Sequence, residues 1–543
     1  MYLGIDVGGT HTDAFLISES QTLSTKIRTL SDISLSIQTI LEKVLELVEP
    51  REIKRLTLST TIGLNSVLTG NADPVGILTT GGPGLPFSPE PSYPLYRSVP
   101  GSQDHQGRVL SPLVPETVQQ AAHEFLDQGA RALVCASKFG PKNPELEEGM
   151  AAACASLTSC RLDKASYLFG GLNFPRRVAS AYLNASIASL YLAFLKNLDK
   201  ILKGFGLQNI DLKILKSDGG VMDTQNASRL PVLALSAGPT ASLLGLWYLY
   251  GTNSSADILM IDMGGTSTDL AILSRGKPFF TPQGLTIAGR NTLIRGLLTS
   301  SLALGGDTDI EYYQGVFVPL AKRQGPPLAL DPQGASKRLP TLTDATNVLG
   351  LSQIGDFELS RKAFERYGPP EKMANLAVQA VLERLRTAIM EFLERINLQP
   401  VYTISDFLVD WKITPDRAVM LGGPANTLAP LVEKKLGIPV HAPKEAPYAN
   451  AMGAALAKST QEAELYANTS NGILTIPTLG VRRKIGNDYN LDKAKQDLIN
   501  SMGDSSVHVT LAESFNNYGG WRTTSKIIRV KAQSSPGLIE IER

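Results

Sequence analysis

The chain is poor in cysteine and in long apolar runs, and both shortages narrow what it can be. It has three cysteines in 543 residues, Cys135, Cys154 and Cys160, and no Cys-x-x-Cys pair. Three cysteines cannot build a disulfide framework, so we expect a reducing, cytoplasmic location. Polar residues interrupt every apolar stretch before membrane-spanning length, so we predict no transmembrane helix. The chain also enters a predicted strand at once, without the segments of a signal peptide.

The chain also has almost no net charge and few histidines. With 52 Lys and Arg against 51 Asp and Glu, the net charge is +1. Such a chain has no long-range field to attract nucleic acid or an anionic membrane, and we expect neither as a partner. No two of the five histidines have zinc-site spacing. The remaining composition is ordinary for an α/β protein, and the length allows two to four domains.

The first residues of the chain read as a strand, a tight turn and an antiparallel strand. Gly8 and Gly9 let the backbone approach a ligand closely, and the turn N–H groups with the hydroxyls of Thr10 and Thr12 form a concavity suited to phosphate. Asp6, at the end of the strand, can hold a hydrated magnesium ion that faces this phosphate. On its own the pattern suits a plain hairpin equally well.

The same pattern occurs a second time, at residues 258–273. The matching pairs are Asp6 and Asp262, Gly8 and Gly264, Gly9 and Gly265, Thr10 and Thr266, Thr12 and Thr268, and Asp13 and Asp269. A duplication at this range indicates two similar folding units facing one another. It makes a phosphate site much more probable than two coincidental turns.

A third glycine motif follows a buried strand predicted at residues 418–421. Gly422 and Gly423 at its end let the backbone lie flat against a ring such as adenine, although a tight turn alone would also explain them. The small-residue helix predicted at 448–457 can pack closely under this loop.

Periodicity predicts further elements of an α/β fold with helices against a mixed sheet. Helices are expected near 37–48, 118–126, 175–203 and 370–396, and strands at 55–58, 75–80, 132–136 and 212–215. Residues 312–353 read as irregular, and runs at 473–476, 507–509, 527–530 and 538–541 suggest strands. We expect an N-terminal domain at 1–175, a second domain at 176–461 and a small strand-rich C-terminal unit at 462–543.

Two acid–glycine hairpins followed by a strand-Gly-Gly-Pro loop resemble the phosphate and adenosine motifs of the actin-like ATPase superfamily. The resemblance extends to about residue 458. It implies two ribonuclease-H-like domains around a nucleotide cleft that closes on Mg²⁺ and ATP. The superfamily includes kinases, chaperones and filaments, so the fold by itself does not give the function.

A more specific resemblance is to the A subunit of the hydantoinase/oxoprolinase family. It rests on motifs in the family's order, at residues 6–13, 59–65, 78–82, 217–220, 236–239, 262–269 and 421–425. Members use ATP to activate the carbonyl of a cyclic amide such as 5-oxoproline or a hydantoin by phosphorylation before ring opening. Relatives serve as ATPase subunits of ketone carboxylases.

The resemblance implies a role for each motif residue. Asp6 and Asp262 would hold hydrated Mg²⁺ and, with Asp13 and Asp269, form the catalytic set. The backbone of Gly8, Gly9, Gly264 and Gly265 and the hydroxyls of Thr10, Thr12, Thr266 and Thr268 would bind the β- and γ-phosphates of ATP. Gly422 and Gly423 would bind its adenosine. Because the chain has no B-type half, we expect a B-type partner subunit; a homo-oligomer is left open.

Alternatives to cyclic-amide hydrolysis are a small-molecule kinase, a carboxylase ATPase subunit and a non-enzymatic, nucleotide-dependent assembly protein. The sequence departs from the family at Gly101–Ser102, at Arg177–Val178 and at Gly305–Thr308, where Glu-Arg, Arg-Thr and Gly-Gly-Gly-Ser are common. We interpret these positions as lying outside the ATP motifs and as affecting the substrate. Asp104 or His105 as a general base is a guess beside the alternative of a solvated loop.

Overall fold

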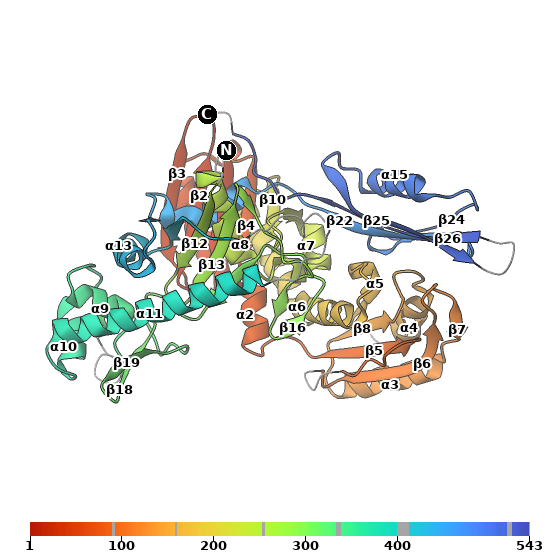
Figure 1. Ribbon diagram of the computed structural model, residues 1–543, viewed down its shortest axis with the longest axis horizontal. Coiled ribbons are helices and arrows are strands. Elements are labelled where there is room, and N and C mark those ends of the chain that lie inside the picture. Colours follow the sequence, from red (N-terminus) through yellow and green to blue (C-terminus); the bar gives the residue numbers. More distant parts are fainter. Residues whose placement is uncertain are drawn as a thin grey trace.

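The computed structural model describes residues 1–89, 93–157, 160–251, 256–332, 338–398, 412–518 and 524–541. Two mixed sheets form its centre, each built on one of the predicted hairpins (Figure 1). The first runs β11-β10-β4-β1-β2-β3: Val221–Asp223, Asp211–Leu215, Arg55–Thr60, Tyr2–Val7, His11–Ile17 and Thr22–Arg28. The second runs β14-β13-β12-β20-β21, with β17 on β13: Lys277–Pro278, Thr268–Ser274, Asp257–Met263, Arg417–Leu421, Val440–His441 and Thr299–Leu302.

Two further five-stranded sheets extend from this centre and lie one above the other in Figure 1. One runs β7-β6-β5-β8-β9: Val109–Ser111, Tyr96–Gln103, Val75–Gly81, Ala132–Ser137 and Arg161–Lys164. The C-terminal sheet is antiparallel and runs β24-β23-β22-β26-β25: Val481–Lys484, Ile473–Ile476, Glu462–Asn468, Thr524–Ser534 and Val507–Tyr518. Short hairpins pair β15 (Thr286–Ile287) with β16 (Arg290–Asn291) and β18 (Ile310–Tyr313) with β19 (Val316–Pro319).

Helices pack against both central sheets and the β5–β9 sheet, and α15 packs against the C-terminal sheet. They are α1 Ile33–Leu45, α2 Ile62–Leu68, α3 Pro115–Asp127, α4 Glu145–Ala155, α5 Ala165–Leu168, α6 Phe174–Gly204, α7 Thr224–Arg229, α8 Ala237–Tyr250, α9 Leu342–Val348, α10 Phe357–Glu365, α11 Pro370–Asn397, α13 Ala425–Leu436, α14 Ala449–Leu456 and α15 Leu491–Met502. The stripe of apolar residues predicted on α11 is buried in the core of the second sheet. The predicted stop of α13 is confirmed at Gly437, which takes the left-handed conformation.

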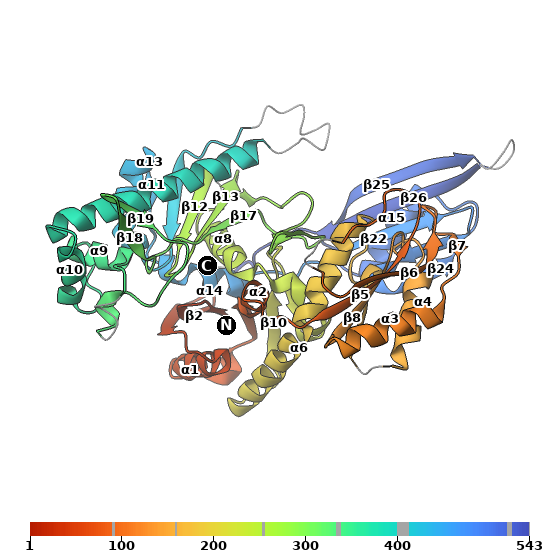
Figure 2. The same cartoon turned by 90° about the horizontal axis from the view of Figure 1, so that it is seen from below.

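Helix α14 joins the two central sheets. Figure 2 shows it with α8 between β2 on one side and β12 and β13 on the other. Glycine makes this possible, because a Cβ on Gly4 of β1 would overlap the carbonyl of Ala451 in α14. A Cβ on Gly245 of α8 would likewise overlap the carbonyl of Ala449. The backbones of β1, α14 and α8 therefore touch directly, and the two sheets are held at a fixed spacing.

One helix in the described part of the chain, α6, is long and apolar enough to cross a bilayer by length and composition. Within its apolar window 67% of the residues are buried inside the protein, and residues such as Arg177, Asn184 and Tyr191 are fully enclosed. These features are typical of the core helix of a folded domain.

The prediction of an irregular segment at 312–353 was wrong for most of its described residues. It contains β19, the end of β18 and helix α9. Helix α9 starts with a capping box in which the Thr341 hydroxyl lies 3.3 Å from the N–H of Asp344, while the Asp344 carboxylate accepts from the N–H of Thr341 at 2.9 Å. The run of proline and glycine around these short elements hid them.

The last predicted strand, at residues 538–541, was also wrong. This segment makes only an isolated bridge from Leu538 to Ala457, and the N–H of Ile539 donates to the carbonyl of Leu456 at 2.7 Å. Its apolar side chains pack against α14 and Tyr2, so their pattern reflects burial and not a ladder. The proposed domain limits at 175 and 461 remain predictions; strands β10 and β11 complete the sheet that contains β1.

Candidate functional site

The two acid–glycine turns have the same local geometry. In each, the antiparallel ladder pairs the two acids, Asp6 with Asp13 and Asp262 with Asp269. The N–H of Gly8 donates to the carbonyl of His11 at 3.1 Å, and that of Gly264 to the carbonyl of Ser267 at 2.9 Å. The sequence repeat is therefore a repeat of structure, with the acid at the end of a strand and the glycines in the turn.

The two turns also face one another. A Cβ placed on Gly265 would lie 2.9 Å from the Oγ1 of Thr10 in the other hairpin and 2.9 Å from Oδ2 of Asp307. Main-chain bonds hold this third segment in place, because the N–H of Asp307 donates to the carbonyl of Gly265 at 2.7 Å. The Oγ1 of Thr10 is buried and has no hydrogen-bond partner among the described residues. The two halves therefore meet through polar atoms of the turns.

A chain of polar contacts links Asp6 and Asp262 through helices α14 and α8. Asn450 of α14 donates from Nδ2 to Oδ2 of Asp6 at 3.2 Å. The Oγ of Ser242 on α8 lies 2.9 Å from Oδ1 of Asn450 and 2.5 Å from Oδ2 of Asp262. The two acids of the separate halves thus share one positioning network, and Asn450 contacts both sides of it.

Burial raises the pKa of all four motif acids. It raises the pKa of Asp6 to about 7, and nearby Asp13 and Asp262 add to this while Ser59 and Asn450 partly offset it. Burial, with the charge of Asp262, raises the pKa of Asp269 to about 7. It raises the pKa of Asp13 to about 6 in spite of Lys26, whose Nζ lies 2.8 Å from Oδ1. The pKa of Asp262 is raised in the same way.

These acids fit a divalent cation. Among the described residues, Oδ1 of Asp6 and Oδ1 of Asp269 are buried and accept no hydrogen bond. Carboxylates that repel one another and have such oxygens without a donor are stabilised by a cation. In the ranges that the structure describes, no three His, Cys, Asp or Glu side chains gather closely enough to cage a metal. A Mg²⁺ here would therefore keep waters and take phosphate oxygens, as this ion commonly does.

The Gly422–Gly423 loop adjoins the second turn. Gly422 has a φ of +87°, and a Cβ there would overlap the carbonyl of Met263 and lie 2.8 Å from Oδ1 of Asp262. Only glycine suits this position. Gly423 is exposed, and nothing lies within 4 Å of where its Cβ would be. One glycine thus serves the packing of the turn, and the other presents open backbone.

The contacts separate the four predicted threonines. Thr12 and Thr268 are fully buried. The Thr12 hydroxyl bonds that of Thr29 at 3.0 Å, and the Thr268 hydroxyl donates to the carbonyl of Leu304 at 2.5 Å. A phosphate role for these two stays a prediction that their contacts do not support. Thr10 and the exposed Thr266 lie in the turns themselves and keep the predicted role open.

The interpretation that Gly305–Thr308 lies outside the nucleotide motifs was wrong. Asp307, which stands where glycine is common in the family, lies against the turn glycine Gly265 and forms an ion pair with Arg323 at 2.9 Å. By contrast, Gly101 sits with φ +134° in β6 near an irregularity in its pairing with β5. Arg177 is fully buried and donates to the carbonyls of Gly171 and Ser137.

The contacts of Asp104 and His105 do not suit a general base. Asp104 accepts from the Nε of Arg108 at 2.9 Å and from two backbone N–H groups, and these donors lower its pKa despite the opposing effect of partial burial. Its carboxylate therefore braces a turn. His105 is exposed, and its carbonyl accepts from Lys142. The contacts favour the solvated-loop alternative.

Four residues of the site were missed from the sequence, namely Ser242, Asn450, Asp307 and Lys26. Each is far from the acids in sequence or lies on a neighbouring strand. Asn450 stands alone as a hydrogen-bonding side chain in the small-residue helix α14, and that contrast was an available signal; Ser242 shares α8 with Thr240 and had no such signal.

Comparison with known proteins identifies the family. Residues 177–463, more than half of the chain, match the family described as hydantoinase/oxoprolinase, and residues 2–157 match its N-terminal region. The chain belongs to the hydantoinase/oxoprolinase family. The resemblance predicted from the ordered motifs is therefore confirmed.

Individual relatives are more distant. The chain is 24% identical over 311 residues to caprolactamase subunit alpha of Pseudomonas jessenii, a match that covers 51% of this chain and 44% of that protein. It is 30% identical over 175 residues to 5-oxoprolinase of Saccharomyces cerevisiae, covering 31% of this chain and 13% of that protein. The chain thus spans less than half the length of either relative.

The fold is shared over almost the whole chain. A nucleotide-free structure of acetone carboxylase matches with a TM-score of 0.73 at 15% identity, covering 99% of this chain and 88% of that one. With the two hairpin-bearing sheets, this confirms the predicted α/β fold with two similar central sheets and a strand-rich C-terminal unit.

Proposed function

We propose that this protein is the ATP-binding component of an ATP-dependent hydrolase that opens a cyclic amide such as 5-oxoproline, a hydantoin or a lactam. The observation that carries the proposal is the meeting of the two acid–glycine turns, with the Asp6–Asn450–Ser242–Asp262 network behind them. Family membership and the distant likeness to caprolactamase and 5-oxoprolinase support it.

The chemistry suits such a site. An amide carbonyl is a poor electrophile, so its oxygen takes the γ-phosphoryl group of ATP, forming an O–P bond as the bond to ADP breaks. Water then adds to the carbonyl carbon, and the tetrahedral adduct expels the ring nitrogen, so that the C–N bond breaks and an acyl phosphate remains. A second water hydrolyses this acyl phosphate to the carboxylate and inorganic phosphate. Phosphoryl transfer requires positioning and neutralisation of charge more than covalent help from the protein.

Each residue then has a role within the proposal. The turn backbones of Gly8, Gly9, Gly264 and Gly265, with Thr10 and Thr266, bind the phosphates through N–H and O–H donors. Asp6 and Asp262 hold a hydrated Mg²⁺, which neutralises phosphate charge when bound. Asn450 fixes the orientation of Asp6, and Asp13 and Asp269 tune the field at the two turns. Gly423 presents open backbone to adenosine.

Phosphate release is the direct test. The rate should be measured with Mg²⁺ and ATP, with and without 5-oxoproline, hydantoins and lactams of several ring sizes. Stimulation by one cyclic amide, with a ring-opened product, supports the proposal. A stable phosphorylated product detected by mass spectrometry would instead indicate a kinase. Nucleotide-dependent assembly without turnover, seen by light scattering, would indicate a non-enzymatic role.

The shared fold with acetone carboxylase favours a second candidate, the ATPase subunit of a ketone carboxylase. The same assay with a ketone and bicarbonate in place of the amide separates the two. We propose a B-type partner subunit for either reaction, because the caprolactamase relative is one subunit of its enzyme. Copurification with the tagged chain from its native host tests for that partner. We also propose that the protein is cytoplasmic.

A further inference from the structure

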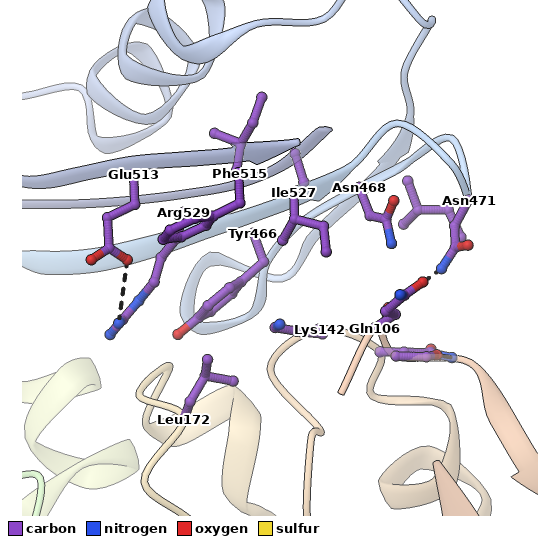
Figure 3. Close-up of a pocket in the computed structure, with 15 residues that line it drawn as sticks. Gln106, Lys142, Leu172, Tyr466, Asn468, Asn471, Glu513, Phe515, Ile527 and Arg529 are labelled. Carbon is purple, nitrogen blue, oxygen red and sulfur yellow. Dashed lines mark hydrogen bonds and ion pairs between the residues drawn. The ribbon is translucent and has the colours of Figure 1, made fainter. Parts of the chain in front are cut away.

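A cavity of about 310 Å³ lies away from the paired acids, between the C-terminal sheet and the loops beside the β5–β9 sheet. Figure 3 shows Tyr466, Phe515, Ile527 and Arg529 reaching into it from the C-terminal sheet, with Leu172 and Lys142 opposite. This volume lies at the lower end of the range for small-molecule sites.

The two units are docked firmly around the cavity. The Thr475 hydroxyl donates to the carbonyl of Pro141 at 2.8 Å, and the Tyr466 hydroxyl to that of Gly170 at 2.8 Å. Asn471 donates from Nδ2 to the carbonyl of Gln106 at 3.3 Å. The cavity is therefore bounded by a formed interface.

Within the described part of the chain, one cation of the cavity wall, Lys142, forms no ion pair with a carboxylate. Arg529 pairs with Glu464 at 2.6 Å and lies 3.9 Å from Glu513. Lys142 donates to the carbonyl of His105 at 2.7 Å, and among the residues with described coordinates it forms no ion pair with a carboxylate. Burial, together with the nearby charge of Arg529, lowers the pKa of Lys142. An anion beside this ammonium would relieve both effects.

A buried side-chain amide in the wall also favours an anionic ligand. The side chain of Asn468 is about nine-tenths buried, its Oδ1 accepts from the N–H of Ser470, and its Nδ2 has no hydrogen-bond partner. Both side chains line the cavity, with Asn468 on the C-terminal sheet and Lys142 on the opposite wall (Figure 3). An ammonium and an unpaired amide donor together suit a carboxylate oxygen.

The rest of the wall is apolar. The rings of Tyr466 and Phe515 and the side chains of Ile527 and Leu172 line it, and Phe515 is 59% exposed at the rim although it is a large aromatic residue. An apolar ligand body would cover this surface.

We propose that this cavity binds a small organic carboxylate with an apolar body, its carboxylate at Lys142 and Asn468 and its chain along Tyr466, Phe515 and Ile527. The inference does not depend on the proposed function, because binding is measured without turnover.

Calorimetric titration of the full chain with sodium hexanoate, without nucleotide, is the test. We expect saturable binding, with hexanamide and hexylamine at least tenfold weaker because neither carries the anion. Lys142→Met should weaken hexanoate binding at least tenfold, whereas Lys142→Arg should keep it within about threefold. Lys484→Met, which removes an exposed lysine of the C-terminal sheet, should leave hexanoate binding unchanged.

Asn468→Asp provides an independent variant, since it puts a negative charge on the same wall without touching Lys142, and it should also weaken binding at least tenfold. Melting curves without ligand establish that each variant is folded. Equal binding of hexanamide and hexanoate, unchanged affinity in folded Lys142→Met or Asn468→Asp, or no saturation by 20 mM hexanoate would overturn the proposal.

Discussion

The two acid–glycine hairpins are alike in backbone but different in charge. In the first, Asp13 has Lys26 at 2.8 Å. In the second, the corresponding Asp269 has no such cation among the described residues, and burial beside Asp262 raises its pKa to about 7. Asp262 has the short contact to Ser242, whereas Asp6 relies on Asn450. Duplication thus preserved the geometry of the turn while the surroundings of the two acids diverged, and this suggests that the two halves have different electrostatic roles.

The largest expected effect is that of removing an acid. Asp262→Ala should lower turnover by about a hundredfold or more, because the variant loses a charge needed to position the phosphoryl group. Asp6→Ala should do the same. Phosphate release measures both, and thermal melts check the fold. Asp257→Asn, on the same strand and bonded to Ser274, is the matched control and should remain active. Near-normal activity of Asp262→Ala would show that Asp262 has no part in the mechanism. If only one of the two variants lost activity, the two halves would contribute unequally to turnover.

The two turns also differ in how much free space surrounds their second glycine, Gly9 or Gly265. Gly265→Ala puts a methyl group 2.9 Å from Thr10 Oγ1 and Asp307 Oδ2, whereas nothing lies within 4 Å of the same position on Gly9. We expect the KM for ATP to rise about tenfold in Gly265→Ala, because the two turns can no longer approach as closely. In Gly9→Ala it should stay within about twofold. Equal effects in the two variants would mean that their contact is unimportant for ATP binding.

Magnesium binding should depend on pH. With its pKa at about 7, the Asp6 carboxyl is largely protonated at pH 6 and must lose its proton to hold a cation, and the raised pKa of Asp262 acts in the same direction. We expect the apparent Mg²⁺ affinity, measured by calorimetry with a non-hydrolysable nucleotide, to fall about tenfold from pH 8 to pH 6. A flat profile would argue against these acids as the site.

The same pKa shifts predict how the stability of the folded protein depends on pH. Because the folded pKa of Asp6 and of Asp269 lies above the unfolded value of 3.8, these acids stabilise the nucleotide-free protein below about pH 4 and lose that contribution as the pH rises through about 7. Mg²⁺ with nucleotide should therefore raise the melting temperature more at pH 8 than at pH 6. An equal rise at the two pH values would contradict this reading.

The smallest effect should come from the cation of the first hairpin. Lys26→Met removes the partner of Asp13, whose pKa then rises above about 6, so activity at pH 7 should fall about threefold and recover by pH 9. Lys43→Met, an exposed lysine on α1, should leave the pH profile unchanged. A loss that does not change with pH would indicate that Lys26 acts through packing alone.

Much of the fold followed from local patterns. The hairpins around Asp6 and Asp262 repeat visibly, and helices such as α6 and α11 carry their periodicity and their stop signals in the sequence. The elements near Asp344 were missed because their stability comes from a capping box and from burial, neither of which appears as a period. Residues 538–541 were misread because apolar residues that cover a helix look like those of an edge strand.

The site was predicted in part for a related reason. The acids and glycines lie in contiguous motifs, so their meeting could be inferred from the repeat. Asn450 and Asp307 reach the site only through tertiary packing, and no local spacing relates them to Asp6 or Gly265. For Thr12 and Thr268 the reverse holds, since their place in the motif suggests a ligand while their contacts serve the protein.

The close contacts of α14 restrict how the two halves can move. Because a methyl group on Gly4, Gly245 or Gly453 would overlap a neighbouring carbonyl, no side chains cushion this helix against β1 and α8. Sliding one half along the other, or turning it around α14, would break these contacts. Helix α14 is therefore clamped between β1 and α8, and it holds Asn450 at a fixed place between Asp6 and the Ser242–Asp262 pair.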